Sequence, residues 1–496
     1  MIARLHPSRL ASLPPGVARP AYDPASHGVG IVHLGLGAFH RAHQAVYLDR
    51  VLATEGGDWR VIGVSCRSPL PRDHLKPQEC LYLVRERDVA RERYQLIGSI
   101  ADALVAPENP AAVIKLMSSR AIRIISLTIT EKGYCRSAAD GGLDLRHHDI
   151  VHDLEHLSHP RSAPGLLLAA LRERQRTGTA PPTLLSCDNL PQNGATLRAV
   201  LMQLASVQEP ALAEWIERHV AFPSTMVDRI VPATTPEDRQ QAAAALGVLD
   251  EALVCTEPFT QWVIEDRFAT ERPQLERVGA QLVADVHPFE LAKLRLLNGS
   301  HSTMAYLGSL LGHTYVHEAI ADELLGALIR RMMGSELAPT LTPVAGLDLS
   351  AYQQALLARF ANPALAHRLQ QIAMDGSQKL PQRLLRPLQQ RLERGESAVL
   401  LTLAVAAWIY YALGRAATEA PRVVDDPLAA KYRDISEWAG TDASAIVAGF
   451  LKLSEVFTPE LAAHARLHRM LAEHLQALFT SGARATMRTV WSGLSQ

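Results

Sequence analysis

The order of apolar and polar residues divides the chain into two stretches of different character. In the first, short apolar runs rich in β-branched residues alternate with amphipathic segments. The runs predict strands over residues 30–34, 59–66, 81–85, 95–100, 122–130 and 183–187, with a helix over 165–176 among the segments between them. From about residue 286 the apolar period is helical almost throughout, which predicts helices over 318–333, 347–360 and 397–413.

Glycines follow the first predicted strand directly. Residues 30–34 read GIVHL and continue into GLGAFH, so that Gly35 and Gly37 lie where the strand turns into a helix. In dinucleotide-binding units this turn lets the backbone approach the pyrophosphate, which lies at the helix N-terminus. His40 takes the position of the third glycine of GxGxxG, so the helix and strand must pack in another way. We expect Gly35, Gly37, Phe39 and His40 to bind the cofactor.

The end of the second strand bears on which cofactor binds. NAD-binding units usually place an acidic residue there, where it binds the ribose 2′-hydroxyl. Here the strand ends in Cys66, Arg67 and Ser68, with no acid before Asp73. Because Arg67 is compatible with a 2′-phosphate, we count it among the cofactor-binding residues. The expected cofactor is NAD, and NADP stays open.

These patterns predict an α/β protein of two domains. A Rossmann-type doubly wound domain is expected over residues 1–285 and a mostly α-helical domain over 286–496. A formal net charge of -1 without a basic block gives no support for a nucleic-acid partner. The N-terminus lacks the apolar core of a signal peptide, and the most apolar run, 397–413, is too short to span a bilayer, which indicates a buried core helix. We therefore expect a cytoplasmic protein without membrane contact.

Cysteine and histidine spacing bears on disulfides and metals. The 5 cysteines are widely spaced without a CxxC pair, which argues against a disulfide framework and a structural zinc site. His148, His152 and His156 are spaced four apart and could bind a metal on one helix face. Their Asp-rich surroundings indicate a polar surface segment instead, and we expect no metal.

The stretch KLRLLNGSH carries an amine, an amide and an imidazole. If it forms an α-helix, about 100° per residue separates Lys293 from His301 by about 80° and from Asn298 by about 140°, so the three groups share one broad face. Neighbouring leucines would withdraw that face from water and lower the pKa of the Lys293 amine from about 10.4 toward neutrality, as a general base requires. A snorkelling lysine and a capping asparagine are the structural alternative.

Two further segments place polar residues in apolar surroundings. CDNLPQNG carries Asp188, Asn189 and Asn193 after the strand 183–187, at the sheet edge where open α/β sheets bind ligands. An asparagine amide there can donate to an oxygen that gains negative charge in a transition state, although an Asx turn has the same pattern. In MVDRIVP, Asp228 and Arg229 form either a substrate contact or a structural ion pair.

Cations and aromatic residues mark two more segments. DGSQKLPQRLLR offers Lys379, Arg383 and Arg386 near a glycine, which suits an anionic group such as a carboxylate, although solvated helix charges have the same pattern. EPFTQWVIEDRF concentrates Glu257, Trp262 and Glu265, and we expect it to line a pocket or to lie between the domains.

Taken in order, these motifs resemble the polyol-specific long-chain dehydrogenase/reductase family. That family includes mannitol 2-dehydrogenases, arabinitol dehydrogenases and fructuronate reductases (mannonate oxidoreductases). The similar motifs span nearly the whole chain and read IVHLGLGAFHRAHQA, ISLTITEKGYC, SCDNLPQNG, TMVDRIVP, EPFTQWVIEDRF and KLRLLNGSH. The resemblance implies a Rossmann-type domain, a helical second domain, an active site between them and no catalytic zinc. The family also lacks the third glycine, so His40 is no departure from its pattern.

The resemblance also implies roles for individual residues. Lys293 falls on the catalytic lysine, Asn189 and Asn298 on the oxyanion-binding asparagines, and His301 on the substrate-orienting histidine. Asp228 matches a substrate contact, and Glu290 matches a glutamate that exchanges protons with bulk water.

The implied activity is NAD(P)-dependent hydride transfer between nicotinamide and a secondary alcohol or ketone of a linear sugar derivative. Mannitol enzymes of the family carry an arginine four residues before the Asp-Gly, where this chain has Gln371. This difference favours the fructuronate reductase branch, with Lys379 and Arg383 as substrate contacts. Mannitol, arabinitol or sorbitol oxidation is the alternative, and a non-catalytic dinucleotide or sugar sensor is an alternative of another class. The expected partner is a sugar acid or polyol, and the expected assembly is a monomer or small homo-oligomer.

Overall fold

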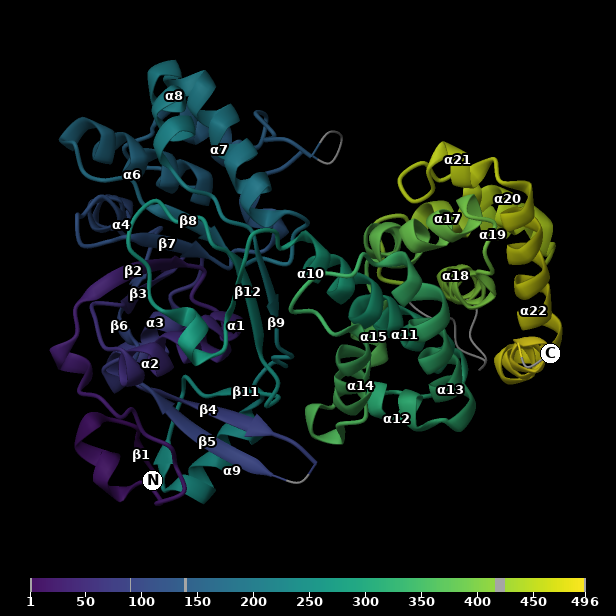
Figure 1. Ribbon diagram of the computed structural model, residues 1–496, viewed down its shortest axis with the longest axis horizontal. Helices are drawn as coiled ribbons and strands as arrows, with labels where there is room; N and C mark the ends of the chain where they lie inside the picture. Colours follow the sequence, from purple (N-terminus) through teal and green to yellow (C-terminus); the bar gives the residue numbers. More distant parts are fainter. Residues whose placement is uncertain (1, 90, 138–140, 415–423, 495–496) are drawn as a thin grey trace. The chain divides into compact units, whose positions relative to one another are not determined.

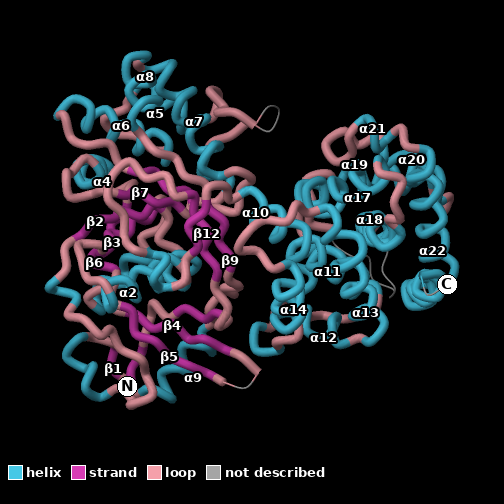
Figure 2. The backbone as a smooth tube through the Cα atoms, in the orientation of Figure 1, coloured by secondary structure: helices cyan, strands magenta, loops and turns pink. Residues whose placement is uncertain are grey.

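Two units make up the chain. The computed structural model describes residues 2–89, 91–137, 141–414 and 424–494, which divide into Met1–His287 and Pro288–Gln496. The division falls two residues after the expected boundary at residue 285. Figure 1 labels the elements of both units, and Figure 2 shows that the strands belong to the first unit, whereas the described part of the second is built of helices.

A five-stranded parallel sheet organises the first unit (Figure 1). In the order of the sheet its strands are β6 (Ile100–Val105), β3 (Arg60–Ser65), β2 (Val29–Leu34), β7 (Ile124–Leu127) and β8 (Thr183–Ser186). The chain builds outward from β2 in both directions, so the strand order reverses between β2 and β7. This is the doubly wound arrangement, in which ligands bind outside the carboxyl ends of the strands at the reversal. The predicted fold class is confirmed.

Neighbouring residues of the strands face opposite sides of this sheet. Val32 and Ile125 belong to one apolar core, whereas Ile31 and Ile124 belong to another. The first core also contains apolar residues of α4 (Pro110–Met117), α5 (His148–Glu155), α6 (Ala163–Thr177), α7 (Asn193–Gln208) and α8 (Pro210–His219). The second contains residues of α2 (Gln44–Thr54). Burial on both faces explains why the strands read as continuous apolar runs rather than as alternating ones.

Smaller elements complete the first unit. Three small sheets pair β1 (Ala3–Arg4) with β10 (Val248–Leu249), β11 (Val254–Thr256) with β4 (Tyr82–Arg87) and β5 (Glu92–Ile97), and β13 (Gln281–Val283) with β12 (Gln261–Glu265) and β9 (Thr225–Asp228). The remaining α-helices of its described part are α1 (Ala38–Ala42), α3 (Leu70–Leu75) and α9 (Pro236–Leu246). Trp262 of β12 is 2% exposed and packs against Tyr47. The segment EPFTQWVIEDRF thus contributes a core strand, and its Trp262 packs within the first unit.

Two strand predictions are wrong in extent. The predicted strand 95–100 covers the end of β5 and the start of β6, because the chain leaves the strand at Gly98 and Ser99. The Gly98 amide there donates to Asp49 at 2.9 Å. The predicted strand 122–130 ends at Leu127, and Thr130 adopts a left-handed φ of 64°.

The second unit is helical in its described part, as predicted. Its α-helices are α10 (His287–Ala292), α11 (Ser300–Leu310), α12 (Val316–Ala321), α13 (Glu323–Met332), α14 (Leu349–Phe360), α15 (Leu369–Ala373), α16 (Gly376–Leu380), α17 (Arg386–Glu393), α18 (Val399–Ala412), α19 (Ala429–Ala439), α20 (Ala443–Leu451), α21 (Pro459–Ala462) and α22 (Ala465–Leu494). Three π-helical turns join some of them, η6 (Lys293–Gly299), η7 (Met333–Leu337) and η10 (Pro381–Leu385). α18 is almost entirely buried between α11 and α22, as its apolar sequence predicts.

The single helix predicted over 318–333 is wrong, because Asp322 divides it into α12 and α13. Asp322 has an extended backbone, with φ -63° and ψ 117°, and its carboxylate accepts a hydrogen bond from the Leu325 amide at 3.0 Å. A capping carboxylate satisfies a donor that the first turn of a helix leaves unpaired, which favours a new start at this residue.

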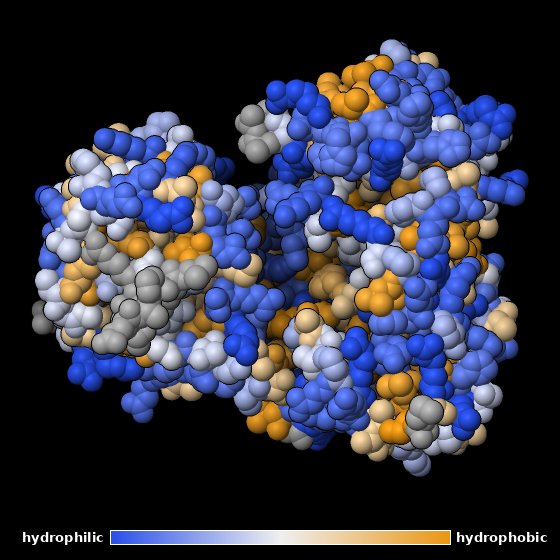
Figure 3. Space-filling model, turned by 180° about the vertical axis from the view of Figure 1, so that it is seen from behind, coloured by the Kyte–Doolittle hydropathy of each residue, from blue (hydrophilic) through white to orange (hydrophobic). Residues whose placement is uncertain are grey.

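Hydrophilic residues predominate on the face of the molecule drawn in Figure 3, where hydrophobic residues form small separate patches. Among the helices of the described chain, none combines the length and the apolar character that crossing a membrane requires.

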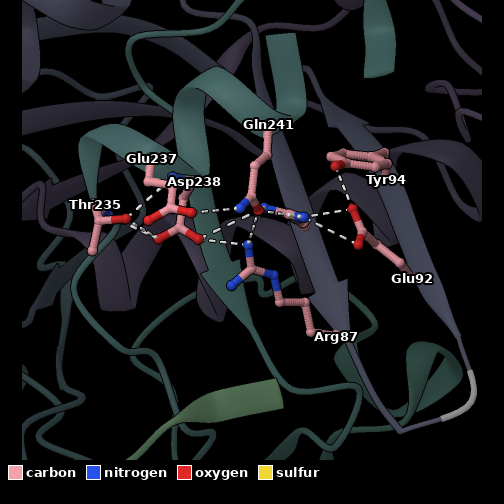
Figure 4. Close-up of polar contacts among 8 residues, drawn as sticks. Arg87, Glu92, Tyr94, Thr235, Glu237, Asp238 and Gln241 are labelled. Atoms are coloured by element: carbon pink, nitrogen blue, oxygen red, sulfur yellow. Dashed lines mark hydrogen bonds and ion pairs between the residues drawn. The ribbon is translucent and has the colours of Figure 1, made fainter. Parts of the chain in front are cut away.

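A polar network fastens the hairpin of β4 and β5 to α9 (Figure 4). Arg85 donates to both oxygens of Glu92, at 2.7 and 3.1 Å, and to Gln241 at 3.2 Å. Arg87 binds Asp238, whose other oxygen accepts from the Thr235 amide at 2.9 Å. Thr235 and Asp238 also form the capping box of α9.

This network makes stability depend on acidic pH. Burial acts to raise the pKa of Asp238, but hydrogen bonds from Thr235 and Arg87 outweigh it, so that the pKa lies below its ordinary value. The hydrogen bond from Arg85 likewise lowers the pKa of Glu92. A carboxyl group with a lowered pKa stabilises the fold above its unfolded-state pKa of about 4, and this stability is lost as the pH falls.

We predict that Asp238→Asn lowers the free energy of unfolding by about 1–2 kcal/mol at pH 7, because it removes the ion pair and half of the capping box. Denaturant unfolding at pH 7, 5 and 4 measures the effect, and the variant should lose less stability than the parent between pH 5 and 4. Glu237→Gln, at the exposed neighbouring position, is the matched control: Glu237 accepts a hydrogen bond from Gln241 at 3.0 Å, which a glutamine can also accept, so the variant should stay within about 0.5 kcal/mol. Equal losses in both variants would contradict the assignment.

Candidate active site

The turn after β2 requires glycine at its first position. Gly35 has a φ of 99°, and a Cβ atom there would lie 2.1 Å from the carbonyl oxygen of Thr128. At Gly37, by contrast, a Cβ atom would meet nothing closer than 3.8 Å, so the bare backbone faces open space at the start of α1. This exposed backbone lies at the strand reversal beside β7, and it fits the pyrophosphate of a dinucleotide.

His40 explains how α1 packs without the third glycine. Its ring stacks on that of His33 of β2, with centroids 3.5 Å apart and planes 14° from parallel. His33 is held by hydrogen bonds of 2.8 Å to Ser126 and to Thr128. The chain then breaks at His43, whose φ of -121° and ψ of -88° separate α1 from α2. The flat ring of His40 therefore fills the space between α1 and β2. With a glycine at this position, the helix could pack directly against the strand.

Both stacked imidazoles are fully buried and neutral at physiological pH. Burial lowers the pKa of His33 to about 3 and, together with the neighbouring His33, holds the pKa of His40 well below its ordinary value. His40 thus supports the turn from within the protein, and direct contact of its ring with a cofactor stays a prediction. Phe39 is partly exposed beside it and stacks on His43. Arg67 is exposed just after the end of β3.

The loop after β8 separates structural residues from an accessible amide. Asp188 accepts hydrogen bonds from the amide of Thr130 at 2.7 Å and from the hydroxyl of Tyr134 at 2.7 Å, which ties the loops after β7 and β8 together. The Asn193 amide nitrogen donates to the carbonyls of Asp188 and Thr225, at 3.0 and 2.9 Å, and is buried. Asn189 is exposed at the same edge. Of the three polar residues of this loop, Asn189 is thus the one that a ligand can reach.

Arg229 anchors the end of β9. Its buried guanidinium donates to the carbonyls of Ala42 and Glu257 and binds the carboxylate of Glu86. Arg229 therefore has a structural role, because it ties β9 to the junction of α1 and α2 and to β4. Asp228, which precedes it, is 3% exposed and lies opposite Gln261 of β12.

In the second unit, the helix predicted at KLRLLNGSH contains a π-helical turn. η6 spans Lys293–Gly299 between α10 and α11, so the expectation of an α-helix over these residues is wrong. In a π-turn the hydrogen bonds join residues five apart, as Lys293 and Asn298 are, whereas α-helical geometry would turn these two about 140° apart. The wider turn therefore brings the amine and the amide closer to one line along the helix.

Close packing holds this turn in place. A Cβ atom at Gly299 would lie 3.0 Å from the carbonyl oxygen of Arg383 in η10 and 3.7 Å from Leu337 in η7. Arg295 is 3% exposed and donates to the carbonyl of Thr340 at 2.6 Å and to Gln390 at 2.9 Å. Gly299 of η6 thus lies against both η10 and η7.

His301 lies one turn beyond Asn298, in α11, and is buried. Its ring packs against Phe360 at 4.7 Å and meets His367 edge-on at 5.4 Å. Burial, and then the nearby His367, Arg359 and Arg383, hold the pKa of His301 well below its ordinary value. The ring is therefore neutral at pH 7, which suits a group that orients a substrate hydroxyl. Its Nε2 atom has no hydrogen-bond partner among the described residues.

The two expected substrate cations differ in their surroundings. The Lys379 ammonium donates to the carbonyls of Met374 and Ile372, at 2.6 and 3.4 Å. The Arg383 guanidinium donates to the hydroxyl of Ser302, at 3.2 Å. Glu290 lies on α10, one turn before Lys293. The roles of Ser302 and His367 have no signal in the sequence, because only the fold brings Ser302 to Arg383 and His367 to His301.

The histidine run is organised differently from the expected i, i+4 pattern. His147, His148 and Asp149 are the group whose potential ligand atoms lie within 4.8 Å of one another. The His147 Nδ1 atom accepts a hydrogen bond from the Asp149 amide at the start of α5, which is a capping role. His152 and His156, with rings 5.0 Å apart, lie one and two turns further along the chain. The observed contacts are those of a capped polar helix.

The comparisons define the class. The Mannitol dehydrogenase Rossmann domain matches residues 29–277, and the Mannitol dehydrogenase C-terminal domain matches residues 285–479. The chain belongs to the mannitol dehydrogenase family and is an oxidoreductase, so the resemblance inferred from the sequence motifs is confirmed.

Individual relatives are similar over nearly their full lengths. D-mannonate oxidoreductase of Escherichia coli (strain K12) is 45% identical over 480 residues, which cover 94% of this chain and 97% of that protein. Mannitol 2-dehydrogenase of Cereibacter sphaeroides is 39% identical over 475 residues, or 95% and 98% of the two chains. The solved Pseudomonas fluorescens mannitol 2-dehydrogenase, a ternary complex with NAD and D-mannitol, has a TM-score of 0.88 at 37% identity and covers 99% of each chain.

We predict that Gly299→Val destabilises the π-turn. The added methyl groups would meet the Arg383 carbonyl and Leu337, and such overpacking typically costs about 1–3 kcal/mol. Turnover should fall as well, because the turn sets the positions of Lys293 and Asn298. Thermal unfolding and steady-state kinetics measure both effects.

The matched control is Gly334→Val in η7, because Gly334 is exposed and a Cβ atom there would meet nothing closer than 3.7 Å. It should change stability and turnover little. If Gly299→Val were as stable and active as the control, the packing around Gly299 would not be what holds the turn.

Proposed function

We propose that the protein is a nicotinamide-dependent oxidoreductase that interconverts D-fructuronate and D-mannonate, with a lysine as general acid and base. The observation that carries the proposal is the π-turn Lys293–Gly299 followed by the buried, neutral His301. The resemblance to the family implies catalytic roles for Lys293, Asn298 and His301. The 45% identity to a D-mannonate oxidoreductase over nearly the whole chain supports the substrate.

NAD is the proposed cofactor, since a relative of 0.88 TM-score is a complex with NAD. The bare backbone at Gly35 and Gly37 fits its pyrophosphate, with Phe39 and His40 supporting the turn. Arg67 follows β3, where NAD-binding units usually place an acidic residue, so NADP is the second cofactor to assay. When bound, the nicotinamide accepts or supplies the hydride.

In this proposal, side chains of the protein remove the proton of the substrate hydroxyl and stabilise the negative charge that develops on its oxygen. For oxidation, the neutral amine of Lys293 removes the proton of the substrate hydroxyl. The amides of Asn189 and Asn298 donate hydrogen bonds to the oxygen as negative charge develops, where each such donor contributes about 2.7–4 kcal/mol. The neutral ring of His301 fixes the direction of the hydroxyl, and Asp228 binds another hydroxyl of the substrate. Glu290 returns the proton of Lys293 to water.

Mannitol 2-dehydrogenase activity is the second candidate. It uses the same catalytic residues, and the relative bound to D-mannitol favours it. The two activities differ in whether the far end of the substrate carries a carboxylate or a hydroxymethyl group. The named relatives are enzymes, so the interpretation as a sensor finds no support among them.

We expect Lys293→Ala to lose about 10²- to 10⁴-fold in turnover, which is the usual contribution of general acid–base catalysis. Cofactor binding should be unchanged, because the glycine turn belongs to the first unit. Steady-state absorbance of the reduced cofactor and fluorescence titration measure the two quantities. Lys452→Ala, an exposed lysine of the second unit, is the control. Near-normal turnover of folded Lys293→Ala would refute the role of the amine, and loss of parent activity after dialysis against a chelator would refute metal independence.

We expect kcat/KM with fructuronate to exceed that with fructose at least about 100-fold, because a carboxylate can form charge-assisted hydrogen bonds that a hydroxymethyl group cannot. The assay uses both reduced cofactors, with mannonate, mannitol, sorbitol and arabinitol in the oxidative direction. Preference for fructose and mannitol would select the second candidate, and no turnover on the whole panel would overturn both.

A further inference from the structure

We infer that the guanidinium of Arg383 is the receptor for the carboxylate of the substrate, and thus the residue that selects sugar acids over neutral polyols. The inference rests on the proposed function and adds to it the residue that binds the carboxylate of the substrate. Four observations within the second unit carry it.

The first observation is the lack of an anion beside Arg383. Its Nη1 atom donates to Ser302 at 3.2 Å, and no carboxylate of the described residues forms an ion pair with it. A guanidinium carries five N–H donors in a planar fork that matches a carboxylate. Most of this fork is therefore available to a ligand. The side chain is partly exposed, so that a small molecule can reach it.

The second observation is the cost of this charge in its present surroundings. Burial lowers the pKa of Arg383 to about 10, partly offset by the phenol of Tyr306. The group is still protonated at pH 7. A cation that is partly withdrawn from water without an anion is unfavourable for the empty protein, and a bound carboxylate would compensate it.

The third observation concerns the other cations of the segment. Lys379 already donates to two backbone carbonyls, and Asp375, Asp425 and Asp426 act on it electrostatically. Arg386, one turn beyond Arg383, is exposed to solvent. Of the three cations expected to suit a carboxylate, Arg383 therefore combines partial burial with unused donors. Lys379 differs from it, because its ammonium donates hydrogen bonds to the backbone at the end of α15 and just after it.

The fourth observation places Arg383 near the reacting end. Ser302 follows His301 directly in α11, so the guanidinium that donates to Ser302 lies close to the ring proposed to orient the substrate. The charge of Arg383 also contributes to lowering the pKa of His301. The Nε2 atom of His301 is buried and has no partner among the described residues. In fructuronate three carbon atoms separate the ketone carbon from the carboxylate carbon, so the two groups can reach two such neighbouring sites.

The test compares the parent with Arg383→Met and Arg383→Lys on mannonate and on mannitol, with saturating cofactor. We expect Arg383→Met to raise KM for mannonate about 10- to 150-fold, the loss of a charge-assisted contact, with little change in kcat. KM for mannitol should stay the same or fall. Arg383→Lys, which keeps the charge but not the fork, should lie between the two. Arg386→Met is the matched control and should match the parent on both substrates.

The outcomes separate the two proposals. If the parent turns over no sugar acid, the proposed function is wrong. If the parent oxidises mannonate but Arg383→Met keeps the parent's ratio of kcat/KM for mannonate to that for mannitol, the inference is wrong. Because Arg383→Met removes a partly buried cation that forms no ion pair with a described residue, we expect it to fold; its thermal unfolding without substrate checks this. Mannonate should raise the unfolding temperature of the parent but not of Arg383→Met. If Arg383→Met does not fold, a parent-like ratio in Arg383→Lys overturns the inference.

Discussion

The wide turn at Lys293–Gly299 is the constraint on which the rest of the second unit depends. Hydrogen bonds that span five residues have poorer geometry than those of an α-helix, so such a turn persists only where packing enforces it. Here Gly299 lets the Arg383 carbonyl approach so closely that an added Cβ atom would lie 3.0 Å from its oxygen. Arg295 fastens the other face to Thr340 and Gln390. The amine and the amide of the proposed mechanism thus owe their alignment to contacts that their neighbours Arg295 and Gly299 make.

The first unit shows the same division between groups that hold the sheet edge and groups that a ligand can reach. Asp188, Asn193 and Arg229 direct their hydrogen bonds to backbone amides and carbonyls of neighbouring loops. Such buried polar groups are costly unless every donor and acceptor is paired, and these bonds provide the pairing. Asn189 and the backbone at Gly37 stay accessible at the edge that the network supports.

Much of the fold could be predicted from the sequence, because strands that are buried on both faces of a parallel sheet require continuous apolar runs such as GIVHL and IRIISL. The glycine turn was predictable for the same kind of local reason, since φ of 99° at Gly35 excludes other residues. The separation of β5 from β6 was not predictable, because the turn at Gly98 is stabilised by the carboxylate of Asp49, which lies far away in the sequence. The π-turn could not be predicted from the sequence either. Its leucines have the spacing of an α-helix, and the packing that holds the turn involves Arg383, about eighty residues further along the chain. The difference between Lys379 and Arg383 likewise exists only in their surroundings.

The stacked pair of His33 and His40 gives the glycine turn an unusual electrical character. Because both rings remain uncharged throughout the physiological range, the floor of the proposed phosphate site contributes no formal positive charge. Oriented peptide dipoles at the start of α1 then contribute to the attraction for a diphosphate. Fixed dipoles do not gain or lose protons, so acidification of the cell would not change the contribution of these dipoles to cofactor affinity.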